Sequence, residues 1–197
     1  MQSISSAWQA TSQLEVVSVV FGVAYIILAA RENILCWPAA FIGTGTAIFL
    51  FWDGSLLMES ALNVYYLLMA VIGWWQWTRG GENQSKLEIQ SWNLKQHLIT
   101  FSLIAILTII SGSLLSKNTT AALPYLDSFT TWAAVITTWM VARKVLENWL
   151  YWIIINSASI LLYIEREFVL YALLYAIYIV IAVIGYVQWK RKLNHAS

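Results

Sequence analysis

The chain has 197 residues, of which 60% are hydrophobic and only 11% are charged, and this balance excludes an ordinary water-soluble domain. Soluble domains carry about 25% charged residues. The formal net charge of +1 offers little attraction to a nucleic acid, and the single cysteine excludes an internal disulfide and a four-cysteine metal site. We therefore expect an all-α integral membrane protein with no nucleic-acid partner.

Seven stretches without a charged side chain follow one another along the chain. They cover residues 16–30, 33–52, 60–78, 98–116, 128–142, 148–164 and 168–189. A helix needs about 20 apolar residues to cross a bilayer, and the shorter stretches reach this length when their uncharged or interfacial flanks are added. The third stretch is extended back to about Leu56, which takes Glu59 into the membrane. The sequence therefore predicts seven transmembrane helices.

The Lys and Arg residues predict the orientation of the chain. Of the 11, all but Lys117 and Arg166 lie on the side that holds the C-terminus and the polar segment 78–97. By the positive-inside rule, the C-terminus is cytoplasmic and the N-terminus lies outside. The first fourteen residues carry no Lys or Arg and so lack the basic region of a cleavable signal peptide. We expect a multi-pass protein of the inner (plasma) membrane, surrounded by lipid, that retains its first helix.

Two motifs occur twice in the same order. Residues 32–37 match 147–152 at an offset of 115, and residues 73–77 match 185–189 at an offset of 112. One explanation is that both matches are interfacial tryptophan belts and nothing more. We expect a true duplication instead, because the order and the near-equal spacing agree.

The duplication divides the chain into three parts. A first three-helix repeat covers residues 14–78, a cytoplasmic linker and the fourth helix cover 79–116, and a second three-helix repeat covers 117–192. The single intervening helix gives the two repeats the same orientation. Parallel repeats of this type occur in transporters, where the substrate site lies at the interface between the repeats.

Polar and aromatic side chains share one face on the predicted helices. On the sixth helix, Trp149, Trp152 and Asn156 recur at helical spacing. A polar group in hydrocarbon is costly and normally faces the interior of the bundle. We therefore expect Trp149 and Glu59 to act as gates. The residues expected to bind the substrate are Asn63, Tyr66, Trp139, Trp152, Asn156, Tyr175 and Tyr178.

Several of these residues have a simpler explanation. An asparagine such as Asn63 or Asn156 could hydrogen-bond one helix to another. Glu59 could be a hydrated residue at the outer rim, and Trp139 could face lipid. Gly73 and its counterpart 112 residues later serve close helix contact more readily than they would touch a ligand.

The residue types missing from the predicted spans narrow the function. Neither His97 nor His195 lies in mid-membrane and no lysine lies in mid-span, which excludes a bis-histidine haem and a retinal Schiff base. The spans hold no acidic pair for ion coupling and no Ser–His pair for an enzyme. We expect a passive transporter for an uncharged or cationic aromatic solute, without cofactor or metal.

The layout of three, one and three helices is similar to that of the SWEET sugar transporters, although their Pro-Gln signature is absent. The motifs resemble more closely those of the PnuC family of nicotinamide riboside transporters, from about residue 14 to 192. The segments that carry this resemblance are Asn63-Val64-Tyr65-Tyr66, Trp149-Leu150-Tyr151-Trp152, Gly73-Trp74-Trp75-Gln76-Trp77 and Gly185-Tyr186-Val187-Gln188-Trp189. The resemblance implies facilitated diffusion of nicotinamide riboside, a vitamin B3 precursor for NAD synthesis, with cytoplasmic phosphorylation trapping the product. It also implies a homotrimer.

The chemistry of this solute suits the predicted face. Nicotinamide riboside carries a cationic pyridinium ring, which Trp and Tyr rings attract by stacking and cation–π contact. Asn63 and Asn156 could hydrogen-bond its carboxamide or its ribose. Transport of a related vitamin such as thiamine or riboflavin, transport of a sugar, and a non-transporting scaffold or sensor subunit remain alternatives.

Overall fold

The computed structural model describes residues 13–53, 57–119, 123–165 and 169–196. Within these ranges the chain forms seven α-helices and one short 3-10 turn, η1 (Glu82–Gln84). The helices are α2 (Gln13–Ala30), α3 (Cys36–Asp53), α4 (Leu57–Arg79), α5 (Leu94–Asn118), α6 (Pro124–Ala142), α7 (Asn148–Glu165) and α8 (Val169–Ala196). Leu56 lies outside the described residues.

Each predicted span corresponds to one of these helices. Most helices continue past the charge-free stretch, because charged side chains at a helix end can reach the polar headgroup region. Helix α8, for example, runs seven residues beyond 189 and includes three cations. Helix α3 instead begins three residues later than predicted, because residues 31–35 form a tight turn in which Glu32 has φ 58°.

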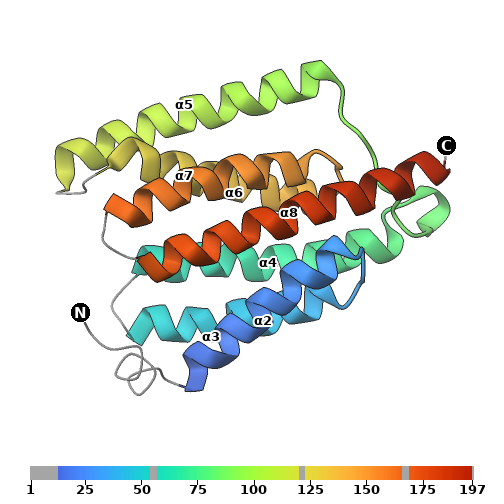
Figure 1. The fold of residues 1–197 in the computed structure, drawn as a ribbon, viewed down its shortest axis with the longest axis horizontal. Coiled ribbons are helices and arrows are strands. Elements are labelled where there is room, and N and C mark those ends of the chain that lie inside the picture. The colour runs from blue at the N-terminus through green and yellow to red at the C-terminus, as the bar shows by residue number, and fades with distance from the viewer. Residues whose placement is uncertain (1–12, 54–56, 120–122, 166–168, 197) are drawn as a thin grey trace.

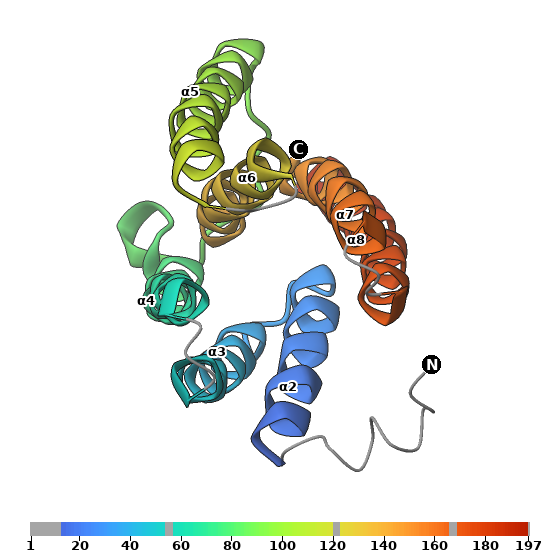
Figure 2. The same cartoon turned by 90° about the vertical axis from the view of Figure 1, so that its left-hand side faces the viewer.

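Six of the helices form a closed ring, and α5 lies outside it (Figures 1 and 2). Going round the ring, α2 packs on α3, α3 on α4, α4 on α6, α6 on α7, α7 on α8, and α8 on α2. We call α2–α4 the first triplet and α6–α8 the second triplet. The triplets therefore meet twice, at α4 with α6 and at α8 with α2.

Helix α5 packs on α6 and presents most of its apolar side chains outward. Ile106 is 54% exposed and Ile109 is 62% exposed. Helix α5 and residues 172–195 of α8 are long and apolar enough to cross a membrane by composition alone. An apolar surface of this extent is stable only when lipid or another protein covers it.

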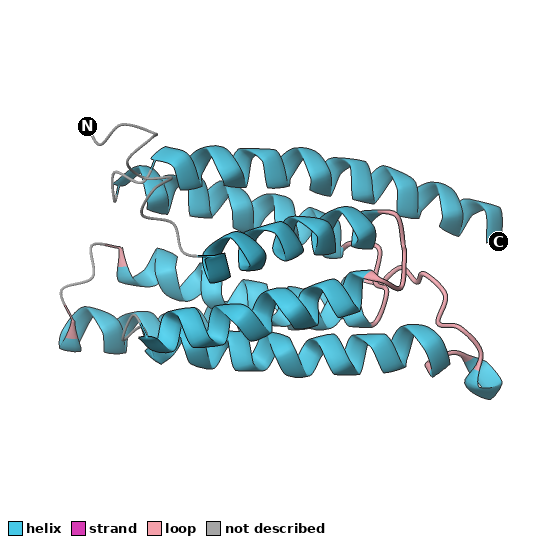
Figure 3. Ribbon diagram, turned by 90° about the horizontal axis from the view of Figure 1, so that it is seen from below, coloured by secondary structure: helices cyan, strands magenta, loops and turns pink. Residues whose placement is uncertain are grey.

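The linker before α5 is attached to the turn between α6 and α7. Figure 3 shows most of the loops gathered at the right-hand end of the bundle. The Gln90 N–H donates to the Lys144 carbonyl at 3.0 Å, and the Leu146 N–H donates to the Gln90 carbonyl at 2.8 Å. The Glu147 carboxylate accepts bonds from the Ser91 hydroxyl and the Trp92 N–H. The linker is thus fixed to the second triplet at the end of the bundle that carries most of the cations.

Candidate functional site

Four tryptophan side chains form a continuous layer across the ring, close to the α2–α3 and α6–α7 turns. Ring centroids lie 5.4 Å apart for Trp37 and Trp77, 5.8 Å for Trp77 and Trp189, and 5.5 Å for Trp149 and Trp189. None of the four is more than 3% exposed. These edge-to-face contacts are the arrangement that aromatic pairs prefer, so this tryptophan layer closes one end of the bundle.

Two glycines make the close packing of this layer possible. A Cβ atom at Gly73 would lie 2.3 Å from the Trp37 ring, and one at Gly185 would lie 2.7 Å from the Trp149 ring. Both contacts are too short for any side chain. The expectation that these glycines permit close helix contact is confirmed, and the partner of each is a tryptophan of the same triplet.

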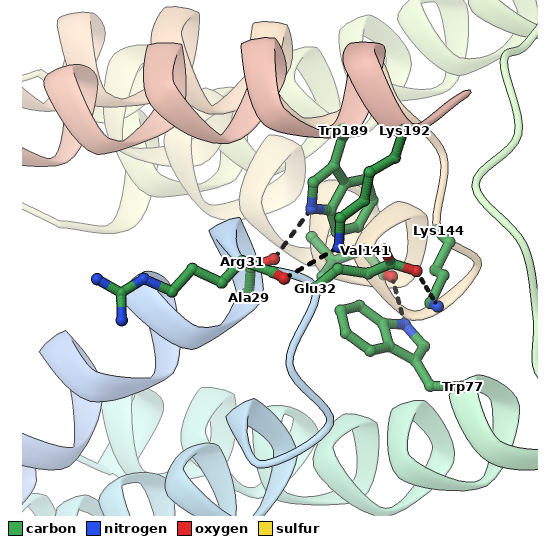
Figure 4. Close-up of polar contacts among 8 residues, drawn as sticks. All are labelled: Ala29, Arg31, Glu32, Trp77, Val141, Lys144, Trp189 and Lys192. Atoms are coloured by element: carbon green, nitrogen blue, oxygen red, sulfur yellow. Dashed lines mark hydrogen bonds and ion pairs between the residues drawn. The ribbon is translucent and has the colours of Figure 1, made fainter. Parts of the chain in front are cut away.

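Reciprocal hydrogen bonds join the two triplets within the layer (Figure 4). The Trp77 indole N–H donates to the Val141 carbonyl at 3.0 Å, and the Trp189 indole N–H donates to the Ala29 carbonyl at 3.0 Å. Each triplet thus supplies one donor and one acceptor. The buried indole N–H groups of Trp37 and Trp149 have no hydrogen-bond partner among the described residues.

An ion pair closes the same end of the bundle (Figure 4). Lys144 Nζ lies 2.6 Å from Glu32 Oε1, and Lys192 Nζ lies 2.8 Å from Glu32 Oε2. The Lys144 side chain is only 6% exposed, and its ammonium lies 4.7 Å from the centre of the Trp77 ring. The carboxylate from the first triplet and the ammonium from the second therefore hold the two turns together above the tryptophan layer.

The surroundings of Glu32 keep it ionised. Burial alone raises the pKa of its carboxyl group, but hydrogen bonds and charge attraction from Lys144 and Lys192 outweigh burial and hold the pKa below its usual value. Because the ionised form is the one stabilised in the folded protein, this contribution is present near neutral pH and is lost as the pH falls through the lowered pKa.

Tyrosine side chains gather on the other side of the tryptophan layer. Tyr163 stacks on Tyr175 with centroids 5.2 Å apart, and Tyr175 meets Tyr178 edge to face at 5.7 Å. Tyr66, which belongs to the other triplet, lies near Tyr175 and near Tyr25. The structure therefore brings Tyr66, Tyr175 and Tyr178 together, as the sequence predicted.

Asn156 lies on α7 between the two aromatic groups. Trp149 contacts Trp189 two turns before it, and Tyr163 contacts Tyr175 two turns after it, so this face of α7 is turned towards α8. Asn156 is 5% exposed, so its polar side chain lies inside the bundle. A polar side chain on a membrane-spanning helix is costly in lipid and normally faces the bundle interior, where it can bind a ligand or water. Trp152, one turn away, is half-buried and packs against both buried clusters of the protein.

The remaining predicted residues lie away from Asn156 and the tyrosine group, or have side chains that the structure does not describe. Asn63 is half-buried on α4 and interacts with a neighbour. Trp139 is 44% exposed and lines an outer groove with Trp92, beneath the Arg143 guanidinium. Trp139 is therefore turned away from the tyrosines, because its face of α6 is turned towards α5. Glu59 lies within α4, but its side chain is outside the described residues.

A sequence profile described as nicotinamide mononucleotide transporter matches residues 12–191. The chain belongs to the nicotinamide mononucleotide transporter family. This is a family of membrane transporters and not of enzymes.

Several known proteins resemble the chain along nearly its whole length. It is 24% identical to the nicotinamide riboside transporter PnuC of Escherichia coli, over 90% of this chain and 85% of that protein. It is 25% identical to PnuC of Haemophilus influenzae, over 94% and 83%. It is 20% identical to the riboflavin/roseoflavin transporter RibM of Streptomyces davaonensis, over 89% and 83%. The crystal structure of the vitamin B3 transporter PnuC shares the fold, with a TM-score of 0.75, 20% identity, and coverage of 97% of this chain and 86% of that one.

The sequence did not predict three parts of the site, which are Tyr25, Trp37 and the Glu32–Lys144 pair. Trp37 and Tyr25 of the first triplet contact each other with centroids 6.0 Å apart, and Trp37 completes the tryptophan layer. The Glu32–Lys144 pair was also missed, since the two residues are far apart in sequence. The offset of 112 already found for the glycine motifs was the signal: applied to Trp37 and Glu32, it leads to Trp149 and Lys144.

Proposed function

We propose that this chain carries nicotinamide riboside across the inner membrane by facilitated diffusion. One observation carries the proposal: a buried asparagine, Asn156, lies between a closed tryptophan layer and a group of tyrosines. This combination suits a flat cationic ring bearing hydrogen-bonding groups. The names of the E. coli and H. influenzae relatives support the same substrate.

In the proposed site, Asn156 and Asn63 bind polar groups of the substrate, and Tyr66, Tyr175 and Tyr178 surround it. Trp152 lies beneath. Trp149, as part of the tryptophan layer, acts as the inner gate, and Glu59 is assigned to the outer entrance. Trp139 is left out of the substrate site because of its outward position.

The two triplets are proposed to be parallel repeats, with residues 14–78 and 117–192 as the repeats and 79–116 as the linker and fourth helix. Structural details of the two triplets support a single offset of 112 residues between the proposed repeats. Glu32 and Lys144, both with positive φ, are 112 residues apart, and so are the unpartnered Trp37 and Trp149. The same shift relates Trp77 to Trp189 and Ala29 to Val141, so each of the two indole–carbonyl bonds has the other as its counterpart. In this proposal the offset for residues 32–37 is also 112, three residues shorter than the 115 that the sequence favoured.

The N-terminus is proposed to lie outside and the C-terminus in the cytoplasm. The tryptophan layer then lies on the cytoplasmic side. A reporter fused after Ser197 should be active only in the cytoplasm, and one fused before Gln2 should be active only outside the membrane. Cytoplasmic activity of both fusions would mean an even number of spans and would contradict the parallel repeats.

Uptake tests the proposed mechanism. Purified protein in liposomes should let radiolabelled nicotinamide riboside equilibrate between the two sides, with no accumulation when a proton or sodium gradient is imposed. The reason is that the predicted spans offer no acidic pair to bind a coupling ion. Accumulation above the external concentration would contradict facilitated diffusion while leaving the substrate unchanged.

Selectivity against the phosphorylated form follows from charge. A charged group without a counter-ion at the centre of a membrane costs about 2.5–3.5 kcal/mol, and no Lys or Arg lies in mid-span. Nicotinamide mononucleotide should therefore bind about 100-fold more weakly than the riboside in calorimetry. Equal affinity would show that a cation from a helix end reaches the substrate.

Riboflavin is the second candidate substrate, because RibM matches the chain over a similar length. The same calorimetric experiment with riboflavin separates the two: tighter binding of riboflavin than of nicotinamide riboside would reassign the substrate.

The homotrimer is a further proposal. Mass measurement of the purified protein with its detergent subtracted would test it, and a monomer would contradict it.

A further inference from the structure

An open apolar groove of about 490 Å³ lies on the outside of the ring, between α4, α5 and α6. It is separate from the proposed substrate site. Ile99, Leu103 and Val135 line its length, and Trp92, Gln96 and Trp139 lie at one end. The Tyr65 hydroxyl beside it already donates to the Val135 carbonyl at 2.7 Å. The groove therefore offers an apolar channel with a mixed aromatic and polar mouth.

The length of the groove matches one leaflet of a membrane. Helix α5 begins at Leu94 near the charged end of the bundle, and Leu103 lies nine residues further on. At a rise of about 1.5 Å per residue, this is about 14 Å of depth. The hydrocarbon core of a bilayer is about 30 Å thick. The groove thus reaches from the interface to about the middle of the membrane, where the acyl chains of one leaflet end.

The mouth of the groove carries a cation. The Arg143 guanidinium lies 5.7 Å from the centre of the Trp139 ring, and Trp139 lines the mouth. Arg143 is exposed and forms no ion pair among the described residues. The acidic group at the mouth is Glu147, whose carboxylate is occupied by the Ser91 hydroxyl and the Trp92 N–H.

We propose that this groove binds one anionic phospholipid, with an acyl chain along Ile99 and Leu103 and the phosphate beside Arg143. Basic pockets between transmembrane helices on the cytoplasmic side recognise anionic headgroups in this way. The assignment to the cytoplasmic leaflet rests on the proposed orientation, whereas the binding itself does not depend on orientation or on the transported substrate.

Native mass spectrometry of the purified full chain tests the proposal. The protein in detergent is given phosphatidylglycerol or phosphatidylcholine with identical acyl chains, and the fraction with one bound lipid is measured. We expect several-fold tighter binding of phosphatidylglycerol. Arg143→Gln should reduce this preference by roughly fivefold. Leu103→Trp, which fills the apolar part, should reduce the binding of both lipids.

A matched control separates the groove from general attraction to a basic surface. Arg191→Gln removes one exposed cation at the same end of the bundle, on α8, which supplies no residue to the groove, and it should leave the preference unchanged. The proposal is overturned if this control loses the preference equally, if the two lipids bind alike, or if glycerol phosphate competes as well as the intact lipid. Loss of nicotinamide riboside binding with lipid preference intact would instead concern only the proposed function.

Discussion

Asn156→Leu is expected to weaken the binding of nicotinamide riboside by roughly 1–3 kcal/mol, about 5- to 150-fold in Kd. The replacement is similar in size and removes only the amide. In the wild type this residue is 5% exposed, so its amide lies inside the bundle. The folded protein itself should lose little, because an apolar side chain of similar size takes the place of the amide. Calorimetry for binding and a thermal melt for stability measure the two effects separately.

Ser157→Ala is the matched control for this variant. Ser157 is the next residue on α7, is exposed, and donates its hydroxyl only to the Ile153 carbonyl of its own helix at 2.8 Å. This control should change neither binding nor stability. If Asn156→Leu bound substrate normally but lowered the melting temperature, Asn156 would be a contact between helices, and the site would have to lie on the tyrosine faces of α4 and α8.

Glu32→Gln is expected to give the largest loss of stability among single changes at the charged end. It leaves the Lys144 ammonium buried beside Trp77 without its carboxylate. Breaking one side of a fully buried pair costs about 3–5 kcal/mol, and we expect about 1–3 kcal/mol here because Glu32 is partly exposed. Lys192→Gln should cost far less, about 0–1 kcal/mol, since this lysine is 50% exposed. Chemical denaturation in one detergent compares the variants.

The pH dependence gives a second measurement on the same pair. The pKa of Glu32 is lowered in the folded protein, so its contribution to stability is complete above the pKa of the unfolded chain and is lost as the pH falls. Wild type should lose stability on acidification more steeply than Glu32→Gln, whose neutral side chain does not titrate. Identical acid profiles, together with a Glu32→Gln stability equal to that of Lys192→Gln, would show that the pair contributes nothing.

The spans could be predicted from the sequence because a bilayer imposes one requirement on every helix, a long stretch without charge. The same requirement located the Asn156 and Tyr175 faces, since polar groups avoid lipid. The sequence cannot show which turn of one repeat corresponds to which turn of the other. Residues 32–37 and 147–152 share letters at an offset of 115, but the close packing of each glycine on a tryptophan ring favours Trp149 as the counterpart of Trp37 in the proposed repeats.

Other features depend on contacts that no local pattern records. In the proposed repeats, Glu32 and Lys144 occupy corresponding turns but carry opposite charges. Comparing the two segments for similarity therefore gives no sign of the ion pair between them. Trp139 has the residue type and depth of a substrate-binding residue. Its outward direction follows only from the position of α5, which packs on α6 outside the ring.

The attachment of the linker to the α6–α7 turn makes the two halves of the protein mechanically unequal. If the proposed repeats rock against each other during transport, the linker and α5 would move with the second triplet, because the Gln90–Val145 bridge and the α5–α6 packing join them. Four helices would then move as one body against three. The groove between α4 and α5 lies on the boundary between these two bodies, so its width would change during such a cycle. A molecule bound in the groove would therefore affect the movement of the two bodies relative to each other.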